Sequence, residues 1–255
     1  MNNRLINLFL WDVKSHRTNI IKAFVAVSIF LSLANNILPL LFERNGIMIH
    51  GSNPARSMAA AMGLFAFLCY MVLAAARVLK PMSRKQERIA FLMLPATNAE
   101  KFIERVFYVI VVNILIFVLG FLTADVVQFL FSFILTPGYH HFVMGVIPYE
   151  FGYIFLNNGD IISLFLLIFF FLWQHSFYVL GGTLFRRSPM LFTACLEFLL
   201  FTLFLIFSVN AGVSFGNDDV LFFCVFFLIA TVFDYSLAYR LFTRSQLVTR
   251  KWFNV

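Results

Sequence analysis

Long apolar runs separated by shorter polar segments dominate the sequence, and six of these runs have the length of a transmembrane helix. A helix needs about 20 mostly apolar residues to cross the hydrocarbon core of a bilayer. None of the runs alternates apolar and polar positions as the strands of a membrane barrel do. Because backbone amides in lipid must find partners within their own segment, each run is predicted to be a helix. The predicted transmembrane helices are residues 23–42, 58–76, 102–124, 161–185, 190–213 and 220–242.

The segment before the first run, residues 4–15, has helical periodicity. Most of its apolar side chains share one face, whereas Arg4 and Lys14 lie on the other. This pattern is typical of a helix that lies in the membrane interface with its apolar side among the acyl chains. The alternative is that the segment simply extends the first transmembrane helix.

A second short helix is predicted between the second and third runs, at residues 84–94. Ser83 and Gln86 have the spacing of a capping box, and a proline ends the segment. Thr97 and Glu100 form a second capping box, which is predicted to open the next helix. The first half of the short helix is basic and the second half is apolar. An exposed apolar stretch needs a cover, either the helix bundle itself or a cytoplasmic partner, and the residues leave both possibilities open.

Composition supports a membrane protein. Of the 255 residues, 62% are hydrophobic and 12% are charged, whereas ordinary globular domains have about 25% charged residues. A water-soluble fold of this size cannot bury so much apolar side chain, which excludes disordered chains, disulfide scaffolds and soluble enzymes. The 3 cysteines fall inside apolar runs and suggest neither a disulfide framework nor a metal site. The chain is therefore predicted to be an all-α polytopic membrane protein with one transmembrane domain over residues 1–255.

Basic residues lie mostly on one side of this predicted topology. Of the 19 Lys and Arg residues, all except Arg44 and Arg56 fall in the N-terminal segment, the second and fourth connections or the C-terminal tail. Since basic residues stay on the cytoplasmic side of membranes, both termini are predicted to be cytoplasmic. The net charge of +7 is therefore explained by topology, and basic residues divided among four segments do not indicate a nucleic-acid site.

The order of these elements resembles the membrane subunit of an ABC-2-type ABC transporter. The shared features are an amphipathic N-terminal helix, six transmembrane helices, two cytoplasmic termini and a capped cytoplasmic helix between the second and third spans. The run Phe-Leu-Met-Leu-Pro-Ala-Thr-Asn-Ala-Glu-Lys-Phe, residues 91–102, is also similar to a recurrent stretch in bacterial permease-like proteins. The family often has re-entrant helices between its last two spans. Here that connection, residues 214–219, is short, and the long outer segment is residues 136–160.

The resemblance implies a permease subunit of the bacterial inner membrane that works as a homodimer or heterodimer with a separate ATPase. It implies that residues 84–94 form the coupling helix that docks the ATPase, and that residues 4–15 form the connecting helix. The side chains expected to contact the ATPase are Arg84, Lys85, Arg88, Ile89, Phe91, Leu92, Met93 and Leu94.

No motif in the sequence supports an enzymatic activity of the chain itself. A phosphate-binding Gly-x-x-x-x-Gly-Lys-Ser/Thr run does not occur, so any ATPase must be a different polypeptide. We expect no catalytic, metal or cofactor site. Two alternatives to an exporter subunit stay open. One is a non-transporting sensor, assembly or immunity-type protein whose basic segment binds anionic lipid. The other is an ion-coupled transporter that uses Glu197 and Asp234.

Three ionisable side chains, His175, Glu197 and Asp234, fall inside predicted transmembrane helices. A charge at such depth costs on the order of 2.5–3.5 kcal/mol, so these groups should face the bundle, be neutral or have partners. They either line a substrate or proton path or form the hydrogen bonds that fix helix packing. Arg77 and Arg240 are the candidate ionic partners.

Two further positions carry expectations about packing. Asp125 is expected to be solvated at the outer interface, near the end of the third span. The pair Gly181–Gly182 lies near the inner end of the fourth span, where two residues without Cβ atoms let another helix approach closely. A hinge at this pair is the alternative.

Overall fold

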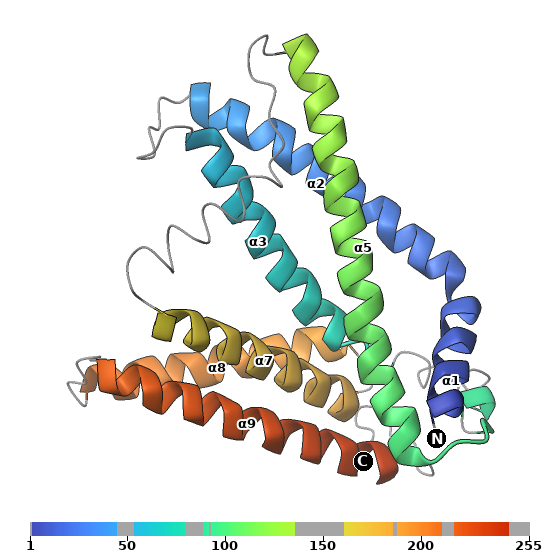
Figure 1. Cartoon of the computed structure of the whole chain (residues 1–255). Coiled ribbons are helices and arrows are strands. Elements are labelled where there is room, and N and C mark those ends of the chain that lie inside the picture. The colour runs from blue at the N-terminus through green and yellow to red at the C-terminus, as the bar shows by residue number, and fades with distance from the viewer. Residues whose placement is uncertain are drawn as a thin grey trace. The chain divides into compact units, whose positions relative to one another are not determined.

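The computed structural model describes residues 2–44, 54–79, 89–91, 93–135, 161–185, 188–210 and 217–244. These residues form seven helices of at least 14 residues, one helical turn at residues 89–91, and no β-strand. The all-helical fold is therefore confirmed for this part of the chain. The helices in Figure 1 are α1 (Asn2–Ser15), α2 (Arg17–Arg44), α3 (Pro54–Ala75), α5 (Asn98–Leu135), α7 (Ile161–Leu184), α8 (Pro189–Asn210) and α9 (Asn217–Arg244).

Four stretches of these helices are long and apolar enough to cross a membrane: Arg17–Ile37, Asn98–Phe131, Leu164–Leu184 and Val220–Arg244. Two shorter apolar stretches lie in α3 and α8. Large apolar side chains on the helices remain exposed, and Phe198 on α8 reaches 74% exposure. Apolar surface of this extent marks contact with membrane or protein, so the described helices indicate a membrane protein.

The helix α5 begins where its capping residues predict. The backbone N–H of Thr97 donates to Oε2 of Glu100 over 2.8 Å, and the N–H of Glu100 donates to Oγ1 of Thr97 over 3.2 Å. These reciprocal bonds satisfy two backbone donors that have no partner inside the helix. The predicted second capping box is thus confirmed, and the helix starts at the next residue, Asn98.

The far end of α5 differs from the sequence-based expectation. The helix continues to Leu135, so its 38 residues exceed the predicted span of 102–124. At 1.5 Å per residue it is roughly 57 Å long. Asp125 is only 2% exposed, and the expectation of a solvated side chain is wrong. Its neighbour Ala124 and, one turn earlier, Phe121 are both packed in a core, which places Asp125 close to the buried face of the helix.

The described chain packs as two units. Unit 1 comprises Met1–Phe9, Met71–Ile110 and Ile162–Val255, and unit 2 comprises Leu10–Tyr70 and Val111–Ile161. In unit 2, Phe67 of α3 packs edge-on against Phe117 of α5, with ring centroids 5.1 Å apart. The core of this unit consists of Leu31, Phe117, Phe121 and Ala124, with Val27, Ala66, Phe67 and Tyr70 packed against it.

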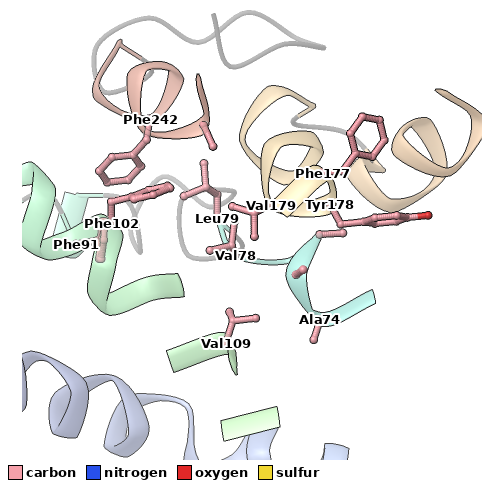
Figure 2. Packing of buried hydrophobic residues seen from close by; sticks show 13 residues of the cluster. Ala74, Val78, Leu79, Phe91, Phe102, Val109, Phe177, Tyr178, Val179 and Phe242 are labelled. Atoms are coloured by element: carbon pink, nitrogen blue, oxygen red, sulfur yellow. The ribbon is translucent and has the colours of Figure 1, made fainter. Parts of the chain in front are cut away.

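Unit 1 contains α7, α8 and α9, which lie side by side in Figure 1. Trp173 of α7 stacks on Phe227 of α9 at 5.2 Å, and Phe204 of α8 meets Phe223 of α9 at 6.0 Å. Figure 2 shows the core of this unit, with the rings of Phe91, Phe102 and Phe242 gathered at one end. The buried members of this core are Ala74, Ala75, Ala76, Val78, Leu79, Phe91, Phe102, Val109, Phe177, Tyr178, Val179, Ala238 and Phe242.

The glycine pair on α7 permits two close approaches inside unit 1. A Cβ atom at Gly181 would lie 1.8 Å from Oγ1 of Thr193 on α8. A Cβ atom at Gly182 would lie 2.7 Å from the backbone carbonyl oxygen of Ala76. Of the two alternatives for the pair, close approach therefore describes the structure.

Replacing Gly182 with alanine should destabilise unit 1, because a carbonyl oxygen of the backbone cannot move aside as a flexible side chain can. Overpacking of this kind typically costs about 1–3 kcal/mol. Equilibrium unfolding of the purified chain in mixed micelles measures the loss. Ala194→Gly, on the exposed face of α8, controls for a general effect of glycine and alanine exchange. A Gly182→Ala chain as stable as the parent would contradict the close approach.

Candidate functional site

The helix α7 carries four polar side chains within five positions, in the middle of an otherwise apolar sequence. Because neighbouring residues in a helix are about 100° apart, they cannot all face the same neighbour. Gln174 and Tyr178, separated by four residues, both contact α8, whereas His175 and Ser176 both contact α9. The polar side chains of α7 therefore join it to two helices at once.

The contact with α8 centres on Glu197, the one charged residue in that helix. Its Oε1 accepts a hydrogen bond from Nε2 of Gln174. Its Oε2 accepts a hydrogen bond from the hydroxyl of Tyr178 over 2.7 Å. Both carboxyl oxygens of Glu197 thus receive a hydrogen-bond donor from α7.

The contact with α9 involves two pairs of side chains. Nδ1 of His175 lies 2.8 Å from the hydroxyl of Tyr235. Oγ of Ser176 lies 3.4 Å from Oδ2 of Asp234, and the same hydroxyl is 2.8 Å from the carbonyl oxygen of Trp173. His175 is 4% exposed and Asp234 is 6% exposed, so both pairs are almost wholly enclosed by protein.

The described hydrogen-bond partners of Glu197 and Asp234 are neutral side chains. Arg77 and Arg240 are both exposed, and neither forms an ion pair with Glu197 or Asp234 among the residues that the structure describes. The expectation of these ionic partners is therefore wrong. A neutral tyrosine or serine beside the acid avoids the burial of a second charge, which costs several kcal/mol. The observed contacts of these polar residues are hydrogen bonds between helices.

The predicted coupling segment is described only in part. Arg84, Lys85, Arg88 and Leu92 lie outside the described residues. Residues 89–91 are helical, but Met93 and Leu94 form a turn, so the predicted helix does not continue to residue 94. A residue before proline is disfavoured in a helix, which explains the early end.

The described side chains of this segment fall into two groups. Phe91 is only 2% exposed, whereas Ile89 is 50% exposed and Met93 is 80% exposed. The segment therefore packs on the bundle through Phe91 and leaves two large apolar side chains uncovered. The helix bundle thus covers Phe91, whereas Ile89 and Met93 are free to contact a cytoplasmic partner.

Buried cations hold Phe91 in unit 1. The guanidinium carbon of Arg105 lies 5.4 Å from the centre of the Phe91 ring, and Nζ of Lys101 lies 6.0 Å from it. The same ring forms a T-shaped pair with Phe242 of α9, with 6.3 Å between ring centroids. Cations within about 6 Å of an aromatic face are attracted to it, more strongly when water is excluded. Residue 91 is thus attached to both α5 and α9.

Burial of the charges at the start of α5 is the feature that sequence reasoning missed. Lys101, Glu104 and Arg105 are each at most 4% exposed, although Lys, Glu and Arg are almost never fully buried without partners. The available signal was their spacing of three to four residues, which puts them on one helix face next to an aromatic segment.

We found no family model, curated protein or solved structure that matches the chain.

The hydrogen bond between Tyr178 and Glu197 should contribute measurably to stability. Tyr178→Phe removes one donor, and we expect a loss of about 1 kcal/mol, within the range found for hydrogen bonds between membrane helices. In a Glu197→Ala background the same substitution should cost much less. A double-mutant cycle on unfolding in mixed micelles measures this difference. Tyr239→Phe is the matched control, because its ring packs against the same core without a described hydrogen bond from its hydroxyl. Equal costs in both backgrounds would contradict the interaction.

Proposed function

We propose that this chain is the membrane-spanning permease subunit of an ABC-2-like exporter in the bacterial inner membrane. It pairs with a second membrane subunit, as a homodimer or heterodimer, and is driven by a separate ATPase. The order of elements along the sequence and the capped start of α5 support this assignment. The ATPase docks on residues 84–94.

The observation that carries the proposal is the two-sided character of residues 89–93. Phe91 is buried against α5 and α9, while Ile89 and Met93 are exposed. A segment that only covered the bundle would turn its large apolar side chains inward. A segment that transmits force needs one attachment to the membrane helices and one free apolar surface for its partner, since exposed apolar patches mark protein contacts.

Coupling works through differential binding. A nucleotide-bound ATPase that binds one position of residues 84–94 more tightly than another shifts the membrane helices toward that position. Phe91 carries the displacement to α5 through Arg105 and Lys101, and to α9 through Phe242. ATP hydrolysis takes place in the partner, and this chain contributes the pathway and the attachment.

The proposal includes six transmembrane helices with both termini in the cytoplasm. Besides the four long apolar stretches, α3 and α8 each contain 22 residues. At 1.5 Å per residue each is roughly 33 Å long, and the hydrocarbon core is about 30 Å thick. The helix α1, interrupted from α2 at His16, lies in the inner interface with Ile6 and Leu10 among the acyl chains.

Cysteine labelling tests this topology. In a background without Cys69, Cys195 and Cys224, a membrane-impermeant maleimide should label Tyr139→Cys in intact spheroplasts. Ala90→Cys should react only after the membrane is opened, because residue 90 is expected to be cytoplasmic. Labelling of Ala90→Cys in intact spheroplasts would reverse the topology and remove the docking site from the side that contains ATP.

Loss of the exposed apolar side chains should uncouple the ATPase. We expect Ile89→Lys together with Met93→Lys to weaken ATPase binding at least about tenfold, or about 1.4 kcal/mol, because apolar anchors dominate protein interfaces. The measurement is ATP hydrolysis that co-purifies with the full chain in mild detergent. Ile6→Lys is the matched control, since that isoleucine is equally exposed, at 55%, but faces lipid in this proposal. Unchanged hydrolysis in the double variant would refute the docking site.

A further inference from the structure

One face of α2 is not covered by the other described helices. At about 100° per residue, five exposed residues of α2 fall within about 80° of one another and form what we name the exposed strip: Thr18, Lys22, Val25, Ile29 and Leu33. The three apolar members are between 46% and 56% exposed. The opposite face of the helix packs on α5 through Val27 and Leu31. The exposed strip is therefore available to a partner outside unit 2.

The polar and apolar residues of the exposed strip are separated along the helix. Thr18 and Lys22 lie in the first two turns of α2, and the apolar residues follow from Val25 to Leu33. Between Lys22 and Leu33 the helix rises about 16 Å, and one leaflet of the hydrocarbon core is about 15 Å thick. The exposed strip thus has the length and the polarity of one phospholipid, with a polar end at the interface and an apolar part along one leaflet.

The polar end of the strip is positively charged. Lys14, Arg17 and Lys22 are all exposed, and none of them forms an ion pair within the described part of the chain. Asp12 is the one acidic residue of α1, and the apolar stretch of α2 has none. Asp12 is 1% exposed and lies 3.0 Å from Nδ1 of His16. Exposed positive charge next to an apolar surface attracts anionic lipid.

We infer that the exposed strip of α2, together with Lys14 and Arg17, binds one anionic phospholipid of the leaflet that surrounds the start of α2. The three cations pair with the negatively charged headgroup, and the Thr18 hydroxyl donates a hydrogen bond to a phosphate oxygen. One acyl chain lies along the apolar residues of the strip. The inference rests on the membrane-spanning role of α2 in the proposed function, but not on the ATPase.

A single tryptophan reports on this site in the full chain. Trp11, Trp173 and Trp252 are replaced by phenylalanine, and Ile29→Trp places the one remaining indole on the apolar part of the strip. The chain is reconstituted in phosphatidylcholine vesicles that contain a brominated lipid, either phosphatidylglycerol or phosphatidylcholine. Bromine atoms quench an indole that they contact, so the two quenching curves give the relative affinity of the site for the anionic lipid.

We expect phosphatidylglycerol to bind at this position at least about tenfold more tightly than phosphatidylcholine, since each basic residue near anionic lipid contributes about fivefold. Removal of the three cations at the polar end should abolish this preference, in the variant Lys14→Gln, Arg17→Gln and Lys22→Gln. The matched control removes three exposed cations elsewhere and should keep the preference: Arg4→Gln, Arg240→Gln and Arg244→Gln. Equal binding of the two lipids by the parent, or an equal loss in the control, would overturn the inference.

Salt provides a second test that needs no substitution of the cations. The Debye length falls from about 10 Å at 0.1 M salt to about 3 Å at 1 M, so the preference for phosphatidylglycerol should decrease severalfold in 1 M KCl. A preference that is unchanged in 1 M KCl would overturn the role of charge. Neither measurement contains the ATPase or depends on the direction in which the chain is inserted. A negative result therefore refutes the lipid site alone, whereas failure of ATPase docking leaves the lipid site intact.

Discussion

Polar side chains in lipid must find their partners within the protein, and this constraint determines how unit 1 is assembled. Under the proposed function α8 crosses the bilayer, and its almost entirely apolar surface gives it no preference between lipid and protein. Its position is set by Glu197, which must face Gln174 and Tyr178. The same rule aligns α9, where consecutive residues Asp234 and Tyr235 meet consecutive residues of α7. The middle of α7 is thus the common reference for both neighbours.

In the proposed mechanism, α9 links Phe91 of the docking segment to the helix α7. Its Phe242 touches the ring of Phe91, and Asp234 contacts Ser176 of α7. The helix is continuous between these points, so a displacement of residue 91 reaches the α7 contact without a flexible intermediate.

Capping predicted where α5 begins, because a cap depends on local properties of the chain. The Thr97–Glu100 cap is an example, since all of its atoms lie within four residues. Pairing between helices was harder to predict. The sequence shows that Glu197 needs a partner, but it does not show which one. Arg77 and Tyr178 are both candidates until the positions of the helices are known, and the structure selects Tyr178. The burial of Arg105 could not be predicted for the same reason, since Phe91 contacts it only in the folded chain.

The glycine pair explains why these polar contacts can form at all. Gly181 lies three residues after Tyr178, and Thr193 lies four residues before Glu197, so the two contacts are neighbours on the same pair of helix faces. A side chain at position 181 would press on Thr193 and push α8 outward, and the 2.7 Å bond of the tyrosine hydroxyl to Glu197 would lengthen. Close packing of small residues therefore sets the helix separation, and the hydrogen bonds set the register. In lipid no hydrophobic force holds helices together, so their association depends on both close packing and hydrogen bonds between helices.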